Sequence, residues 1–172
     1  GLGLVLEYAA PLEQRLASTI ELAAASTVSV ATAPGPRQPV IAVIGAGNYA
    51  SRVLIPALRQ TTALLGTIVT EGGVSGAIAG RREGFARAST DTAGVLRESG
   101  IDAVVIATRH DSHAALAAQA LEQGKHVFVE KPLALDDEQL GLVESAWRTA
   151  AQKGCGGQLM VGFNRRFAPH VI

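Results

Sequence analysis

An apolar strand pattern that leads directly into a glycine-rich turn constrains the fold of this chain more than any other feature. Residues 40–44 read Val-Ile-Ala-Val-Ile, a run typical of a strand buried on both faces of a parallel sheet. The six residues that follow are Gly45, Ala46, Gly47, Asn48, Tyr49 and Ala50. They fit the G-x-G-x-x-A turn of a dinucleotide site, and apolar residues at helical spacing come next. The sequence therefore predicts a strand, a turn and a helix in the order that nucleotide sites use.

Each small residue of this turn has a physical purpose. Gly45 permits the tight turn out of the strand, Gly47 lets the backbone approach a pyrophosphate, and Ala50 lets helix and strand pack closely. Residues 46, 48 and 49 complete the turn, and the following helix directs its N–H groups and positive dipole end at the phosphates. We therefore predict that residues 45–50 bind a dinucleotide. The alternative is a plain glycine-rich turn that binds nothing.

Composition limits the class of protein. The chain has 172 residues, of which 48% are apolar, enough for one main domain. Fifteen basic and 15 acidic residues balance, so the basic patch of a nucleic-acid binder or a membrane-surface protein is not expected. Cys155 is the single cysteine, and no Cys/His cluster has zinc spacing, so we expect neither a disulfide nor a metal. No apolar run is long enough for a membrane span. A protein of the reducing cytoplasm fits these observations.

Residues 1–39 differ from the rest of the chain. Residues 4–8 and 20–22 could form short strands or an edge ribbon, and the proline-rich residues 34–39 resemble a linker. Because Pro34, Pro36 and Pro39 cannot donate ladder hydrogen bonds, we expect no central strand here. Two interpretations stay open: the tail of an upstream domain, or an N-terminal extension over the sheet edge.

From residue 40 onward, strand and helix patterns alternate with short connections. Strands are expected at 40–44, 64–70, 85–88, 101–108, 125–129 and 158–163, and helices at 51–60, 75–83, 92–98, 112–123 and 136–153. This alternation predicts an α/β fold of the Rossmann type. Its doubly wound parallel sheet would carry helices on both faces, with residues 40–172 as the NAD(P)-binding domain.

The residues after the second strand bear on the choice of cofactor. Thr70 and Glu71 lie where nucleotide sites commonly place an acidic residue for the ribose 2'-OH. Glu71 favours NAD if it turns to the ribose, whereas Thr70 with Arg81 or Arg82 could accept the 2'-phosphate of NADP. A third interpretation is that these charges are simply solvated.

Further polar residues follow the later strands. Ligands of open α/β sheets lie beyond the carboxyl ends of the strands, so residues there are candidates for cofactor contact. They are Ala107, Thr108, His110, His113, Glu130, Lys131 and Arg165. His113 could instead simply occupy the first turn of its helix. Lys131, stiffened by Pro132, is our candidate catalytic residue, because its ammonium can stabilise a substrate oxygen during hydride transfer. The alternative for Glu130 and Lys131 is a surface ion pair that caps the sheet.

Four segments carry a resemblance to a known family. They are the fingerprint, residues 102–108 (DAVVIAT), residues 124–132 (GKHVFVEKP) and residues 161–167 (VGFNRRF). Together they resemble the glucose-fructose oxidoreductase/inositol dehydrogenase (Gfo/Idh/MocA) family over residues 40–172. The resemblance implies an NAD(P)-dependent oxidoreductase of sugars, nucleotide sugars or cyclitols, with Lys131 in the position of the family's catalytic lysine.

The resemblance also implies a wider architecture. The family carries a second α/β domain, which supplies the substrate floor, the remaining acid/base and often the oligomer interface. We therefore expect a homo-oligomer, and a cofactor-binding fragment that does not turn over substrate alone. Residues 48–50 and 108–111 resemble a branch fused behind a zinc-type alcohol-dehydrogenase-like half, of which residues 1–39 would be the tail.

One residue departs from the family pattern, and two other functions stay open. The family usually has proline where this chain has Arg109, which alters the expected edge of the nicotinamide site. A non-catalytic NAD(P)-binding regulatory or scaffolding module is the first alternative, although Glu130 and Lys131 would be superfluous in it. A cofactor-free interaction domain is the second, and it would require a blocked phosphate turn.

Overall fold

The computed structural model describes residues 17–22 and 37–170. The strands are β1 (Thr19–Glu21), β2 (Val40–Ile44), β3 (Leu64–Val69), β4 (Arg87–Ser89), β5 (Ala103–Ile106), β6 (His126–Glu130) and β7 (Leu159–Gly162). The longer helices are α3 (Gly73–Glu83), α4 (Thr92–Arg97), α5 (His113–Glu122) and α6 (Asp137–Gln152). Shorter helical segments are η1 (Ala50–Leu54), α2 (Ile55–Leu58), η2 (His110–Ser112) and η3 (Asn164–Phe167).

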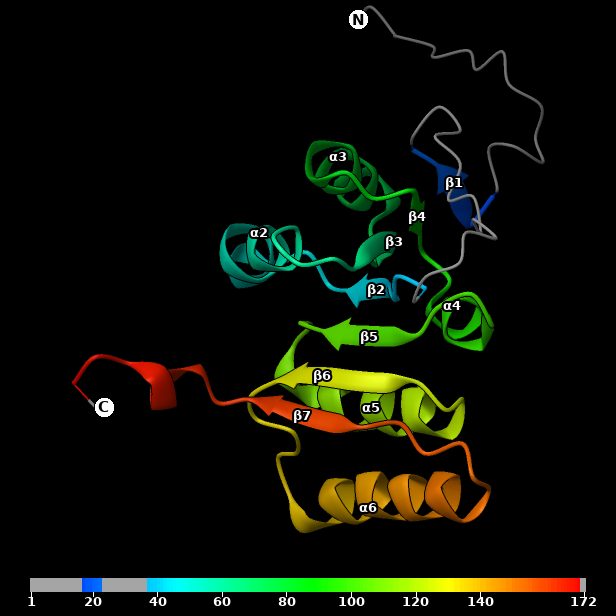
Figure 1. Cartoon of the computed structure of the whole chain (residues 1–172), viewed down its shortest axis with the longest axis vertical. Helices are drawn as coiled ribbons and strands as arrows, with labels where there is room; N and C mark the ends of the chain where they lie inside the picture. Colours follow the sequence, from blue (N-terminus) through cyan, green and yellow to red (C-terminus); the bar gives the residue numbers. More distant parts are fainter. Residues whose placement is uncertain (1–16, 23–36, 171–172) are drawn as a thin grey trace, which may run out of the picture.

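The strands form one seven-stranded sheet in the order β1-β4-β3-β2-β5-β6-β7. All neighbouring strands are parallel except β1, which is antiparallel to β4. In Figure 1 the arrows of β2, β5, β6 and β7 point to the same side, where the red helical segment η3 also lies. The strand order reverses at β2, so the turn after β2 lies at the switch point where such sheets bind ligands.

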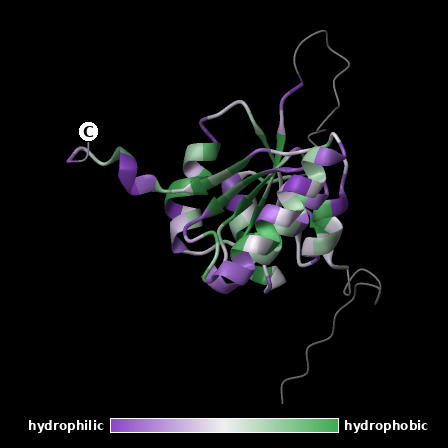
Figure 2. Ribbon diagram, turned by 90° about the horizontal axis from the view of Figure 1, so that it is seen from below, coloured by the Kyte–Doolittle hydropathy of each residue, from purple (hydrophilic) through white to green (hydrophobic). Residues whose placement is uncertain are grey.

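Helices cover both faces of the sheet, and each face has its own core. One core joins alternate residues of β2 and β5 to α4, α5 and α6, and the other joins the intervening residues to η1, α2 and α3. Along β2, for example, Ala42 and Ile44 belong to the first core, and Ile41 and Val43 to the second. Figure 2 shows these hydrophobic strands between helices of mixed hydropathy. The predicted Rossmann-type fold is confirmed.

The helix after the glycine turn is continuous over residues 48–58, but its middle is a π-helical segment, η1. The Ile55 N–H donates to the carbonyl oxygen of Ala50, five residues earlier. Pro56 follows directly and has no N–H to continue the regular pattern. The helix predicted at 51–60 is therefore present, begins earlier, and contains a wider turn that its spacing did not predict.

The strand predicted at 85–88 is shifted and shortened to β4. Gly84 has a φ of 84°, and both Gly84 and Phe85 donate their N–H groups to the carbonyl oxygen of Gly80. These bonds close the C-terminus of α3, so the chain reaches the sheet only at Arg87. Phe85 is buried beneath α3 instead of lying in the sheet.

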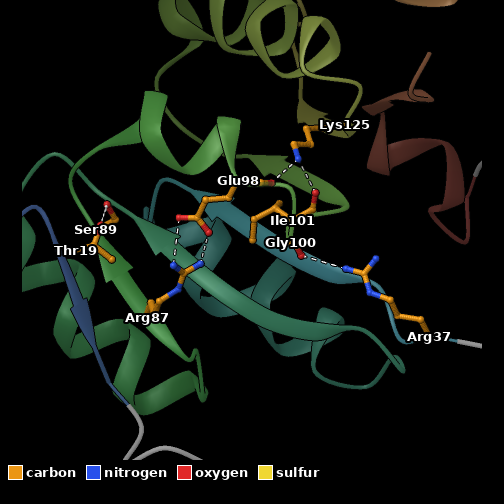
Figure 3. A network of polar contacts seen from close by, with 8 residues as sticks. All are labelled: Thr19, Arg37, Arg87, Ser89, Glu98, Gly100, Ile101 and Lys125. Carbon is orange, nitrogen blue, oxygen red and sulfur yellow. Dashed lines mark hydrogen bonds and ion pairs between the residues drawn. The ribbon is translucent and has the colours of Figure 1, made fainter. Parts of the chain in front are cut away.

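The described part of the N-terminal segment lies at the sheet edge. Thr19, Ile20 and Glu21 pair with β4, and the Thr19 and Ser89 hydroxyls lie 2.8 Å apart (Figure 3). The prediction of an edge strand near residues 20–22 is thus confirmed. The strand predicted at residues 4–8 lies outside the described residues.

A polar network joins the loop before β5 to the strands around it (Figure 3). Lys125 is 6% exposed, and its Nζ donates to the carbonyl oxygens of Glu98, at 2.6 Å, and Ile101, at 2.8 Å. Burial lowers the pKa of Lys125 from its usual 10.5, and the nearby Asp102 and Glu98 carboxylates oppose part of this shift. Arg87 pairs with the Glu98 carboxylate. The network anchors the amino ends of the central strands, opposite the glycine turn.

Candidate dinucleotide site

Gly45 is required by the backbone of the turn itself. Its φ is 96°, and a Cβ added there would lie 2.5 Å from the Ala107 carbonyl oxygen. Its N–H donates to the carbonyl oxygen of Val69 at 2.8 Å. Gly45 thus sits tightly between the carboxyl ends of β3 and β5, and only glycine fits there.

Gly47, in contrast to Gly45, has free space beside it. A Cβ added to Gly47 would meet no protein atom within 4 Å, and φ is not positive there. Its carbonyl oxygen accepts from the Ser51 N–H at 2.9 Å, the first bond of the helix. Nothing in the described protein requires glycine at this position. The open space beside Gly47 is therefore available to a ligand that approaches the backbone closely.

Two cavities adjoin at this turn. The first has a volume of about 700 Å³ and the second about 370 Å³, and both are lined by Gly47, Ala107 and Thr108. The predicted site residues around the first cavity are Gly45, Ala46, Gly47, Thr70, Glu71, Ala107 and Thr108. Those around the second are Gly47, Asn48, Tyr49, Ala50, Ala107, Thr108, His110, His113, Glu130, Lys131 and Arg165. The fold thus gathers all the predicted residues at the carboxyl ends of the strands.

The first cavity extends from the glycine turn to the end of β3. Glu71 is exposed and lines it, together with Thr70, whose hydroxyl donates to the Gly72 carbonyl oxygen at 3.0 Å. Neither Arg81 nor Arg82 lines this cavity, and Arg82 Nε is instead bonded to Glu83 Oε1 at 2.7 Å. The charged side chain at the end of β3 that faces the cavity is therefore acidic.

The second cavity lies beyond the end of β6. Lys131 is exposed there, and among the described residues no ion pair includes Lys131 or Glu130. The expected alternative of an ion pair that caps the sheet is thus not seen in this part of the chain. Glu130 Oε1 is buried without a hydrogen-bond partner in the described structure, an unusual state for a carboxylate oxygen.

Tyr49 lines the second cavity and is bonded to a residue from the far end of the chain. Asn164 Nδ2 donates to the Tyr49 hydroxyl oxygen at 2.8 Å, although the two residues are 115 positions apart. This bond ties the helix after the glycine turn to η3, the segment that also carries Arg165. Asn164 lines this cavity but was not among the predicted site residues. Its place after β7 could have indicated it, whereas its bond to Tyr49 could not be predicted.

His113 occupies the first position of α5, and its side chain is fully buried. Its Nδ1 lies 2.7 Å from the Pro132 carbonyl oxygen, and its Nε2 lies 3.2 Å from the Thr108 carbonyl oxygen. Both ring nitrogens are thus engaged by the protein backbone. The alternative placement in the first helical turn is confirmed.

Several residues that line the first cavity escaped the sequence analysis. They are Gly72, Ser75, Thr90, Thr92 and Leu116. Arg109, Asp111 and Ser112 also line this cavity, and they lie in the segment after β5, where the sequence predicts cofactor contacts. Thr90 follows β4, so the strand-end rule could have found it. Ser112, whose hydroxyl lies 2.7 Å from that of Thr108, belongs to the segment 108–113 but carried no signal of its own.

The described residues also lack the features of a membrane span and of a metal site. Within residues 17–22 and 37–170, no helix combines the length and the apolar character that a membrane crossing requires. In the same ranges, no group of three or more His, Cys, Asp or Glu side chains is placed to hold a metal ion.

Known relatives share both sequence and fold with this chain. Residues 40–163 match the model of the oxidoreductase family with an NAD-binding Rossmann fold, GFO_IDH_MocA. An inositol 2-dehydrogenase of Saccharopolyspora erythraea is 36% identical over 138 residues, which is 77% of this chain and 38% of that protein. The scyllo-inositol 2-dehydrogenase (NAD(+)) of Bacillus subtilis is 42% identical over 52% of this chain and 25% of its own length.

Solved structures of similar fold include two inositol dehydrogenases. A putative myo-inositol dehydrogenase of Sinorhizobium meliloti has a TM-score of 0.67 at 29% identity, over 77% of this chain and 38% of that one. The apo scyllo-inositol dehydrogenase of Lactobacillus casei has a TM-score of 0.68 at 25% identity, over 76% and 38%. This chain thus spans less than half the length of these relatives. The fusion to a zinc-type alcohol-dehydrogenase half stays a prediction. The Rossmann fold, the open turn and these matches together show that the chain belongs to the Gfo/Idh/MocA family of NAD-binding oxidoreductases.

Proposed function

We propose that this chain is the dinucleotide-binding part of an NAD-dependent dehydrogenase that oxidises a hydroxyl group of a cyclitol or sugar. The open space over Gly47 carries the proposal, because a glycine that the fold does not require is expected where a ligand contacts the backbone. The names of the inositol dehydrogenase relatives support the substrate class.

The residues around the two cavities suit the two halves of a dinucleotide. The N–H groups at the start of the helix over residues 48–58 would hold the pyrophosphate. The first cavity would take the adenosine half, with Glu71 at its ribose, and the second the nicotinamide half. Glu71 follows β3 and lines the first cavity, whereas Arg81 and Arg82 do not line it. We therefore propose NAD over NADP.

Lys131 is the proposed catalytic residue. When bound, the dinucleotide supplies the hydride acceptor. The chain's own contribution is a cation: the exposed Lys131 ammonium can donate a hydrogen bond to the substrate oxygen and stabilise its developing negative charge. Glu130, with its unpartnered oxygen beside this cavity, is a candidate acceptor for a ligand hydroxyl. The base that removes the hydroxyl proton would come from a segment outside this chain.

Two further features complete the proposal. Large apolar side chains are exposed around β7 and α6, namely Trp147, Met160, Phe163 and Phe167, which favours self-association.

The single cysteine favours a reducing compartment such as the cytoplasm.

Calorimetric titration of the purified chain with NAD, NADH and NADP tests the proposal. We expect one site per chain, with NAD bound more tightly than NADP. The complete protein should then reduce NAD in the presence of a cyclitol or sugar. Absence of binding for all three dinucleotides would refute the assignment. Binding by the chain without any turnover by the complete protein would instead indicate a non-catalytic module.

A further inference from the structure

The His113 ring connects two backbone segments that both border the second cavity. One is the end of β5, where Thr108 lines both cavities. The other is the turn after β6, where Pro132 directly follows Lys131. The ring borders the second cavity but is fully buried, and it contacts the two segments that shape the cavity.

The geometry makes this a specific contact rather than simple filling of the core. The ring is 0% exposed, and its two nitrogens face two different carbonyl oxygens, at 2.7 Å and 3.2 Å. A neutral imidazole has one N–H and donates to one of them, whereas an imidazolium donates to both. An apolar residue of similar size would leave buried carbonyl oxygens without these donors. The shorter contact, to Pro132, lies next to the lysine in the chain.

Few neighbouring groups could replace the His113 ring as a hydrogen-bond donor to these carbonyl oxygens. The His110 ring packs against the His113 ring edge to face, with centroids 5.6 Å apart, and also lines the second cavity. The Thr108 hydroxyl is bonded to Ser112 at 2.7 Å, on the other side of the same loop. In the described structure, the side-chain nitrogen within hydrogen-bonding distance of the Pro132 carbonyl oxygen is His113 Nδ1.

We propose that His113 is a positioning residue: it holds the Thr108 loop and the Lys131–Pro132 turn at the separation that a nicotinamide needs. It does so without touching the ligand. This inference rests on the proposed function, since it concerns the nicotinamide end of the same site. Its prediction is selective: loss of His113 should affect the nicotinamide half of a dinucleotide and leave the adenosine half alone.

Two ligands and two variants separate this role from a general role in folding. NADH contains both halves of the dinucleotide, whereas ADP-ribose lacks the nicotinamide. His113→Leu removes both ring nitrogens, and His113→Asn retains an amide N–H near the position of Nδ1, facing Pro132. Calorimetry of the wild-type chain and both variants with each ligand gives six affinities, and circular dichroism reports whether each variant is folded.

We expect the wild-type chain to bind NADH more tightly than ADP-ribose. In His113→Leu the NADH affinity should fall by about tenfold, the scale of one or two lost hydrogen bonds, while that of ADP-ribose changes less than about twofold. His113→Asn should recover much of the NADH affinity. If His113→Leu does not fold, His113→Ala takes its place, with the same expected loss of NADH affinity.

Three results would overturn the inference while leaving the proposed function intact. These are equal loss of affinity for both ligands in the folded variant that lacks the donor, unchanged NADH affinity in that variant, or equal affinity of the wild-type chain for both ligands. In the last case no nicotinamide contact would exist for His113 to position. Failure of the wild-type chain to bind either ligand would instead refute the proposed function itself.

Discussion

Gly45 and Gly47 lie two residues apart in the same turn, yet the structure predicts opposite consequences for replacing them with alanine. At Gly45 the new Cβ would lie 2.5 Å from the Ala107 carbonyl oxygen and 2.8 Å from its carbon, and φ is positive. At Gly47 the same Cβ would meet nothing within 4 Å. Gly45→Ala should therefore damage the fold, and Gly47→Ala should spare it.

The magnitudes follow from these two environments. A left-handed backbone costs an L-residue about 1–2 kcal/mol, and overpacking against a backbone that cannot swing away adds about 1–3 kcal/mol. Gly45→Ala should thus lower the free energy of unfolding by about 2–5 kcal/mol. For Gly47→Ala, the reduced entropy of the unfolded chain and the weaker helix cap oppose each other, which leaves a change within about 1 kcal/mol.

Ligand binding should be sensitive to a side chain at Gly47, although the fold tolerates one there. Gly47→Val would place its side chain in the space where the phosphates approach, at the cost of one or two charge-assisted hydrogen bonds. Each contributes about 1.5–3 kcal/mol, so the NADH affinity should fall at least about tenfold. Urea unfolding gives the stabilities, and calorimetry gives the affinities. If Gly45→Ala is as stable as the wild type, or Gly47→Val binds NADH unchanged, the reading of this turn is wrong.

Three further predictions concern single side chains. In the complete protein, Lys131→Met should lower turnover by about two or more orders of magnitude with little change in dinucleotide affinity. Full activity of this variant would show that the lysine has only a structural role. Glu71→Ala should raise the ratio of NADP to NAD affinity about tenfold, because a carboxylate near the 2'-phosphate is removed, and a constant ratio would exclude Glu71 from the ribose site. The pKa of Lys125 is lower in the folded chain than its usual 10.5, so the unfolded chain binds more protons just below that pH. The free energy of unfolding should therefore rise between neutral pH and 10.5 relative to Lys125→Met, and parallel pH profiles from urea unfolding would contradict this.

Much of this fold could be predicted because its signals are local. The run at β2 is apolar at every position, and its side chains do fill two cores. The glycine turn and the strand-end rule also act over a few residues, so the cavity walls at Glu71, Thr108 and Lys131 followed from their places after strands.

The features that were missed depend on contacts between distant segments. No pattern near Tyr49 indicates that its hydroxyl meets Asn164, 115 residues later. The burial of His113 follows from the approach of Pro132, which lies on another loop. The shift of β4 follows from the closing of α3 by Gly84, a choice between helix cap and strand that apolar spacing alone does not decide.

The most direct test of the central claim is a crystal structure of the chain grown with NADH. We expect the pyrophosphate within hydrogen-bonding distance of the backbone N–H groups that follow Gly47, the adenosine ribose beside Glu71, and the nicotinamide in the cavity that Lys131 and Thr108 line. A dinucleotide bound elsewhere, or in this groove with its phosphates away from Gly47, would contradict the account.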